Sequence, residues 1–333
     1  MIPDECFTYE DAQTALFKFE ELLRRWSILI KPRSALEAAA LSVMDLVDLR
    51  QRPDSTSWLV DLGGDAANLV GLNDLAVHII RVADHPDFKE VVPHLRLLNE
   101  GEPLQNRASQ SRDHAANKLF ELLVACWAMR AGANDVRLDN PHRSKGDNPD
   151  VMFRWRDDTW GVACKALHSR VPQTIFDKMR DGIRQIEACR ADCGIVLLNA
   201  KNVIRHTEYL RLANHDKSGK REEPLYQSLP RSEPQRMLMS EVDALLAGVR
   251  DGIDPQEMID SFLGTKTMPA WIIWAHTTSV VDLEGRPMLT SVPRLTVGQL
   301  SQQPNSPLSL RPADLELLEQ FNEAANISPR PKA

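Results

Sequence analysis

The chain has 333 residues, 43% of them hydrophobic and 26% charged, and a formal net charge of -7. This composition is typical of a globular protein, and the length allows one large core or two to three smaller modules. The longest apolar runs, at 119–129 and 270–275, fall short of the ~20 residues that a membrane helix needs, so we expect no membrane span. The negative charge argues against a protein that is covered by nucleic acid.

The N-terminal residues and the cysteines both favour a cytoplasmic protein. The first residues include Asp4, Glu5, Glu10 and Asp11 and lack the basic start and apolar centre of a signal peptide. The five cysteines are an odd number scattered over the chain, which is typical of reduced thiols.

The charge is distributed unevenly. Residues 108–236 carry 22 Lys and Arg against 17 Asp and Glu, whereas both flanking segments have more acidic than basic residues. A basic centre between acidic flanks would suit a local phosphate-binding surface, although solvated charged faces produce similar imbalances.

Residues 1–105 are expected to form a mainly helical interaction region. Apolar residues recur at helical spacing over 9–30, and 33–49 continues the pattern. Such an acidic, helical region would bind a partner subunit or a second copy of the chain.

Residues 106–200 show an alternation of helices and strands. Ser111 or Asp113 can cap a helix that runs to about Arg130 and closes at Gly132. A short strand at 135–138, a loop rich in turn formers and a β-hairpin at 150–155 and 160–167 follow. A helix at 172–188 then precedes a continuous apolar strand at 193–199. The order helix, strand, hairpin, helix, strand predicts a mixed α/β sheet.

Residues 201–333 are expected to form an α+β extension. Residues 212–236 are rich in polar residues and prolines, which predicts a mobile basic loop. Helices are expected at 238–249, 255–262 and 313–324, and a second hairpin at 271–281 and 287–292.

A carboxylate and an ammonium group are expected to meet at one edge of this sheet. Side chains alternate along a strand, so Ala163 and Lys165 face one layer while Cys164 faces the other. Asp150 begins the neighbouring strand, and the hairpin turn brings it alongside. Phosphodiester hydrolysis uses such a group, because oxygen ligands hold Mg²⁺ while a lysine stabilises charge or positions water.

The motif Pro149-Asp150, followed by Gly161-Val162-Ala163-Cys164-Lys165 within this order of elements, resembles the PD-(D/E)xK nuclease superfamily. The resemblance covers about residues 108–200 and implies a restriction-endonuclease-like sheet flanked by helices. It implies that Asp150 is a metal ligand, Lys165 the catalytic lysine and the carbonyl of Cys164 a further ligand. It also implies that Glu121 joins the site from the preceding helix and that Gln185 faces the site or the DNA.

The departure from the family pattern is Ala163, where a Glu or Asp is expected. A methyl group cannot ligate a metal, so Mg²⁺ binding and activity should fall strongly. Three explanations stay open: an inactivated laboratory variant, which we favour because the rest of the motif is intact; a natural pseudo-nuclease; or Glu121 as the replacement acid. An ion-paired or solvated Glu121 is the simpler alternative for that residue.

The function expected from this resemblance is a Mg²⁺-dependent DNA nuclease, with Mn²⁺ as an alternative ion and with RNA as an alternative substrate. The family association suggests an effector of a bacterial defence or restriction system, regulated by a separately encoded ATPase or helicase. The runner-up is a non-catalytic DNA-binding or assembly subunit on a nuclease-like scaffold. The residues expected to contact nucleic acid are basic or amide side chains around the motif: Arg143, Lys145, Arg154, Arg170 and Gln185.

Overall fold

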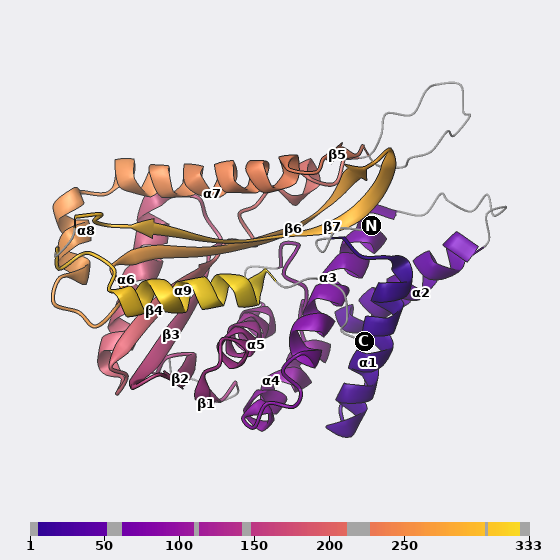
Figure 1. The fold of residues 1–333 in the computed structure, drawn as a ribbon, viewed down its shortest axis with the longest axis horizontal. Helices are drawn as coiled ribbons and strands as arrows, with labels where there is room; N and C mark the ends of the chain where they lie inside the picture. The colour runs from indigo at the N-terminus through magenta and orange to yellow at the C-terminus, as the bar shows by residue number, and fades with distance from the viewer. Residues whose placement is uncertain are drawn as a thin grey trace.

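A computed structural model of the chain describes residues 6–51, 62–109, 113–141, 148–211, 227–303 and 306–326. In this part of the chain, helices cover both faces of one mixed sheet of seven strands (Figure 1). The expectation of an α/β fold is therefore confirmed. None of the described helices is long and apolar enough to cross a membrane.

The sheet has the strand order β1-β2-β3-β4-β6-β5, with β7 paired to β6. The strands are β1 (Asn134–Leu138), β2 (Val151–Trp155), β3 (Asp158–Ala166), β4 (Cys193–Asn199), β5 (Leu229–Pro230), β6 (Ala270–Leu283) and β7 (Arg286–Gln299). The predicted hairpin is present, because β2 and β3 pair antiparallel with Val151 opposite Val162. β3 then pairs parallel with β4, and β4 with β6.

The sheet continues across residue 200, where the sequence suggested a separate extension. Leu197, Leu198 and Asn199 of β4 pair with 272–274 of β6. The second predicted hairpin, β6–β7, is longer than expected, with a ladder that runs from Ala270 and Gln299 to Leu283 and Arg286. The predicted core and its extension thus share one sheet.

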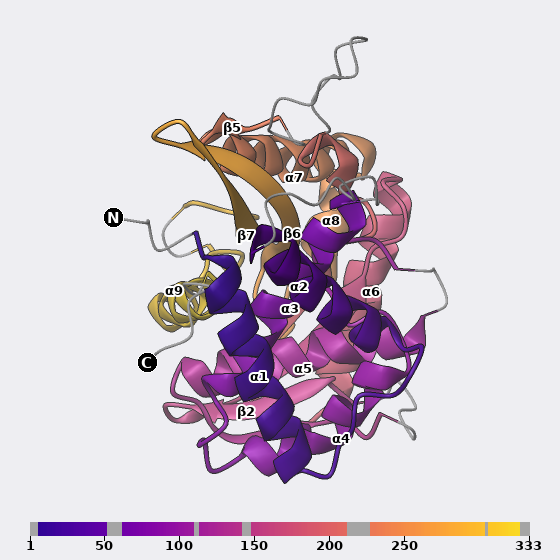
Figure 2. The ribbon, with the colours of Figure 1, turned by 90° about the vertical axis from the view of Figure 1, so that its right-hand side faces the viewer.

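The helices divide between the two faces of the sheet. Those described are α1 (Tyr9–Arg25), α2 (Ala35–Gln51), α3 (Leu62–Ile80), α4 (Val92–Leu95), α5 (His114–Arg130), α6 (Pro172–Ala188), α7 (Glu233–Gly252), α8 (Pro255–Phe262) and α9 (Pro312–Ala325). α6 packs on β3 and β4, and α7 on β6 and β7, whereas α3, α5 and α9 contact the sheet from the other side. α1, α2 and α3 also pack against one another (Figure 2).

The sequence signals for α5 and α6 explain where these helices lie. The Asp113 side chain accepts a hydrogen bond of 2.8 Å from Ala116 N, and Gly132 adopts φ +82° after the helix end, as predicted. α5 is buried around almost its whole circumference, whereas α6 has one apolar face that includes Ile175, Met179 and Ile183. A helix buried on all sides belongs in the centre of the molecule.

The start of α7 also differs from its prediction. The loop expected over 212–236 lies partly outside the described residues, but 229–230 form β5 and α7 begins at Glu233. Pro234 caused the error, because proline reads as a loop signal but is well tolerated in the first turn of a helix, where it lies here.

Candidate active site at the edge of β3

Asp150 is fixed where β2 begins. Its main-chain N–H donates to Val162 O at 3.0 Å, and the N–H of Cys164 donates to its Oδ2 at 2.8 Å. Gly161 permits this approach, since a Cβ there would lie 3.0 Å from the Pro149 side chain. The carboxylate is buried, with 6% of the residue exposed. Its position therefore depends on the main chain of β3, as the hairpin predicted.

Lys165 approaches the same edge and is held by α6. Its ammonium group donates to the side-chain oxygen of Gln185, whose amide nitrogen donates to the main-chain carbonyl of Asn148. Gln185 is buried, and Lys165 is half-buried. Gln185 thus connects Lys165 to the segment that leads into Asp150, which fixes the ammonium relative to the carboxylate.

A second carboxylate, from Glu121, enters from α5. Lys118 Nζ lies 2.9 Å from each oxygen of Glu121 and 3.7 Å from Asp150 Oδ1. Both α5 side chains are almost completely buried. His94 Nε2 also lies 3.5 Å from Glu121 Oε2. The alternative that Glu121 is ion-paired is therefore confirmed, in a buried setting beside Asp150.

Ala163 is fully buried on the face of the sheet that α6 covers. Its neighbour on β4 is Val196, and α6 lies so close there that a Cβ on Gly182 would be 2.6 Å from Val196 Cγ1. A carboxylate at 163 would have to enter this packed layer. Glu121 comes from the α5 face, so it supplies a second acid from the opposite side and does not occupy the place of a residue-163 side chain.

The two carboxyl groups have raised pKa values. Burial, followed by the neighbouring Glu121 charge, raises the pKa of Asp150 to about 7, although Lys165, Lys118 and the Cys164 N–H oppose this. Burial likewise raises the pKa of Glu121 to about 7 against the effect of Lys118. Burial also acts to lower the pKa of Lys118, but the charge and hydrogen bond of Glu121 and the charge of Asp150 raise it overall. Perturbed groups that converge in this way are typical of functional sites.

Cys164 contributes through its main chain. Its N–H points toward Asp150, and within a strand the carbonyl of the same residue faces the same neighbouring strand. The thiol belongs to the core on the α5 side, where burial raises its pKa. All five cysteines are free, as expected.

Of the basic residues expected to contact nucleic acid, the two that the structure describes already have partners within the chain. Arg143 and Lys145 lie outside the described residues. Arg154 is exposed but lies 3.0 Å from Asp135, and Arg170 donates to Glu241 of α7 and to a main-chain carbonyl. The guanidinium of Arg170 thus holds elements of this chain together, through partners that are distant in sequence.

The donor atoms at the strand edge are compatible with Mg²⁺. Among the described residues, no group of three or more His, Cys, Asp and Glu side chains is placed to hold a metal ion. Mg²⁺, however, is usually held through one or two carboxylates, with water and substrate phosphates completing its shell. Asp150, Glu121 and the Cys164 carbonyl provide hard oxygen atoms of this kind.

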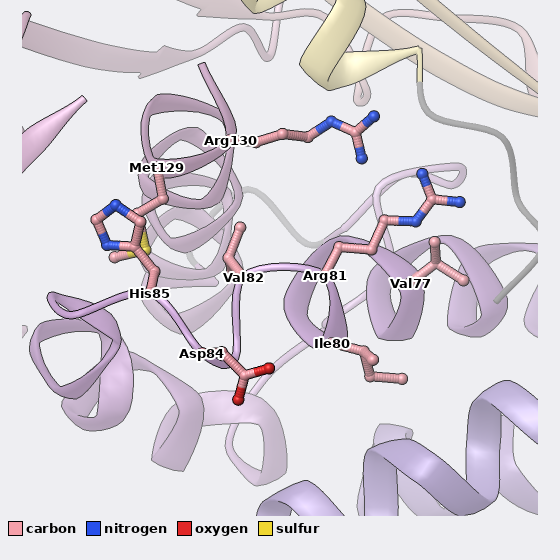
Figure 3. Close-up of a pocket in the computed structure, with 8 residues that line it drawn as sticks. All are labelled: Val77, Ile80, Arg81, Val82, Asp84, His85, Met129 and Arg130. Atoms are coloured by element: carbon pink, nitrogen blue, oxygen red, sulfur yellow. The ribbon is translucent and has the colours of Figure 1, made fainter. Parts of the chain in front are cut away.

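A separate cavity of about 530 Å³ lies at the other end of α5, away from Asp150 and Lys165. Figure 3 shows Arg81 of the segment after α3 and Arg130 of α5 extending toward the same side of this cavity. Burial, followed by the charge of Arg130, lowers the pKa of Arg81 to about 10. Because the residues that line it include Met129 and Arg130 but neither Asp150 nor Lys165, the cavity is separate from the site at the strand edge.

No protein-family model, curated protein or solved structure matches this chain. Assignment of the site therefore depends on its geometry. Lys118 and His94 were not expected there; Lys118, three residues before Glu121, was visible only as a helical neighbour of that residue, and His94 carried no signal in the sequence.

Proposed function

We propose that the chain is a metal-dependent phosphodiester hydrolase of the nuclease class, with its site at the edge of β3. The observation that carries the proposal is the meeting of Asp150 and Glu121 around Lys118, with the charge of Lys165 acting on Asp150 from β3. Buried charges of this kind cost free energy. Their retention at the end of a strand supports a role in chemistry.

Each residue has a defined role in this proposal. Asp150, Glu121 and the Cys164 carbonyl would hold Mg²⁺ or Mn²⁺, which polarises the phosphate and lowers the pKa of bound water. Lys165 would place its ammonium group beside the phosphate and stabilise the negative charge that develops there. Gln185 is a positioning residue, because it orients Lys165 through a hydrogen bond.

The substrate we propose is DNA, with RNA as the alternative, in the cytoplasm. The restriction-endonuclease-like architecture and a role in bacterial defence belong to the same proposal and rest on the motif around Asp150 and Lys165. A separately encoded ATPase or helicase, or a second copy of this chain, would be the protein partner.

The proposal is tested with the purified chain on supercoiled, linear and single-stranded DNA, with Mg²⁺, Mn²⁺ or EDTA. Because an alanine stands at position 163, where the motif has an acid, we expect only weak cleavage by the unchanged chain. EDTA should abolish this cleavage, and Asp150→Asn and Lys165→Ala should each reduce it by about 100-fold or more, equivalent to ~2.7 kcal/mol of transition-state stabilisation. Arg24→Ala, which removes an exposed cation from α1, should leave cleavage unchanged. Equal cleavage by the Lys165 variant would reject this site.

The second candidate is a non-catalytic DNA-binding or assembly subunit. It is favoured by the fully buried Ala163 and by the presence of Lys118 between the two acids. It predicts DNA binding that EDTA does not change, and no cleavage by the chain or by Ala163→Glu. Circular dichroism must show that Ala163→Glu folds, because the new carboxylate would enter a packed layer.

A further inference from the structure

Lys118 lies where a cation shared by Asp150 and Glu121 would bind. Its Nζ is 2.9 Å from both oxygens of Glu121 and 3.7 Å from Oδ1 of Asp150. The other oxygen of Asp150, Oδ2, already accepts the Cys164 N–H. Three of the four carboxylate oxygens therefore face one ammonium group, and Oδ2 is held by the main chain.

The other cation at this edge, Lys165, has a different direct hydrogen-bond partner. Lys165 directs its ammonium group to the amide oxygen of Gln185, on the α6 side. Lys118 is 3% exposed, and a buried ammonium group is strongly unfavourable unless it is paired. Lys118 thus depends on the two acids. Glu121 has Lys118 as its close countercharge, whereas the charges of both Lys165 and Lys118 act on Asp150.

We infer that Lys118 is an internal cation that competes with the divalent metal ion for Asp150 and Glu121, so that the metal binds only when the Lys118 ammonium group withdraws. The inference rests on the proposed function, which assigns the two acids as metal ligands. A metal ion that bound both acids would require their oxygens at about 2.0–2.1 Å, which leaves no room for an ammonium group in contact with the same atoms.

The experiment is a calorimetric titration of MnCl₂ or MgCl₂ into the full chain without nucleic acid. We expect Lys118→Met, which keeps the length of the side chain and removes its charge, to bind Mn²⁺ about tenfold more tightly than the unchanged chain, a typical coupling between competing ligands. Mn²⁺ should also raise the melting temperature of Lys118→Met more than that of the unchanged chain.

Lys201→Met is the matched control. Lys201 is also buried, but its Nζ donates to the carbonyl of Leu104 at 3.0 Å, so its removal should leave Mn²⁺ affinity unchanged. Equal Mn²⁺ affinity of the unchanged chain and Lys118→Met would overturn the inference, as would an equal gain in Lys201→Met. If Lys118→Met does not fold, Lys118→Gln should bind Mn²⁺ more tightly than Lys118→Arg, and the reverse order would overturn the inference.

The outcomes separate this inference from the proposed function. Tighter Mn²⁺ binding by Lys118→Met without cleavage by any variant supports the competition and rejects the nuclease proposal. Cleavage by the unchanged chain with no gain in affinity on removal of Lys118 supports the nuclease and rejects the competition.

Discussion

Two buried charge clusters in this molecule are built in opposite ways. In the Glu241 cluster, one carboxylate accepts hydrogen bonds from Arg170, Arg205 and the Tyr209 hydroxyl. In the strand-edge cluster, which comprises Asp150, Glu121, Lys118, Lys165 and Gln185, two carboxylates lie close together. The first cluster offers several donors to one acid, and the second places two acids around one ammonium group.

The pKa values reflect this difference. Burial acts to raise the pKa of Glu241, but its hydrogen bonds to Arg170, Arg205 and Tyr209 lower it overall. Burial raises the pKa values of Asp150 and Glu121. The neighbouring lysine charges lower them, but both pKa values stay above their usual range. A fully bonded cluster stabilises the fold, whereas an undercompensated one is typical of a site prepared for a ligand.

The largest effect on stability is expected from Glu241→Gln. Removing the charge leaves Arg170 and Arg205 without their common carboxylate, so the free energy of unfolding should fall by about 2–3 kcal/mol. This value is below that for a fully buried ion pair because both arginine side chains are partly exposed to solvent. Urea denaturation measures the change. The control is Glu257→Gln, which breaks an exposed ion pair with Arg180 and should change stability by less than about 0.5 kcal/mol. Equal losses in both variants would contradict the comparison.

A pH effect is expected beside the Glu241 cluster, at His206. Burial lowers the pKa of this imidazole to about 4, and its ring nitrogens lie 3.0 Å from Thr277 Oγ1 and 2.6 Å from Lys201 O. A depressed histidine pKa contributes stability that is present above the unfolded value of 6.5 and is lost as the pH falls toward 4. The loss attributable to His206 should be on the order of 2 kcal/mol at pH 4.5.

The measurement for His206 compares urea denaturation of the unchanged chain and His206→Asn between pH 7 and pH 4.5. The variant should lose less stability over this range, because the asparagine does not take up a proton. An identical slope in both proteins would show that the histidine is not the source.

The smallest effect is expected from Glu121→Gln. A carboxyl group with a raised pKa contributes stability that is present below its unfolded value and lost as the pH rises through about 7. Glu121→Gln removes a carboxylate charge that burial disfavours, but it also removes the closest countercharge of Lys118. Because these two effects oppose each other, the free energy of unfolding should change by less than about 1 kcal/mol at pH 8 and change little at pH 5. Thermal denaturation at both pH values measures this. A loss at pH 8 as large as that of Glu241→Gln would remove the distinction between the clusters.

The sequence predicted those parts of the site that depend on local patterns. Alternation along 160–166 and the turn before it placed Lys165 beside Asp150, and Asp113 with Gly132 defined the ends of α5. The pairing of Arg170 with Glu241, 71 residues away, left no local signal. The burial of Lys118 could not be predicted from the sequence either. α5 is buried on nearly all sides, so its sequence shows no separate polar face from which the direction of a lysine side chain could be inferred.

The pairing of β4 with β6 has a consequence for the order in which the protein is made. The hairpin that carries Asp150 and Lys165 joins neighbouring segments, whereas Leu198 finds its partner Ile273 only after a further 75 residues. On a ribosome, the β4 edge stays open while α7 and α8 are synthesised, and an open edge invites pairing with other chains. Completion of β6 closes this edge, so we expect the chain to be most prone to aggregation before the late hairpin has been made.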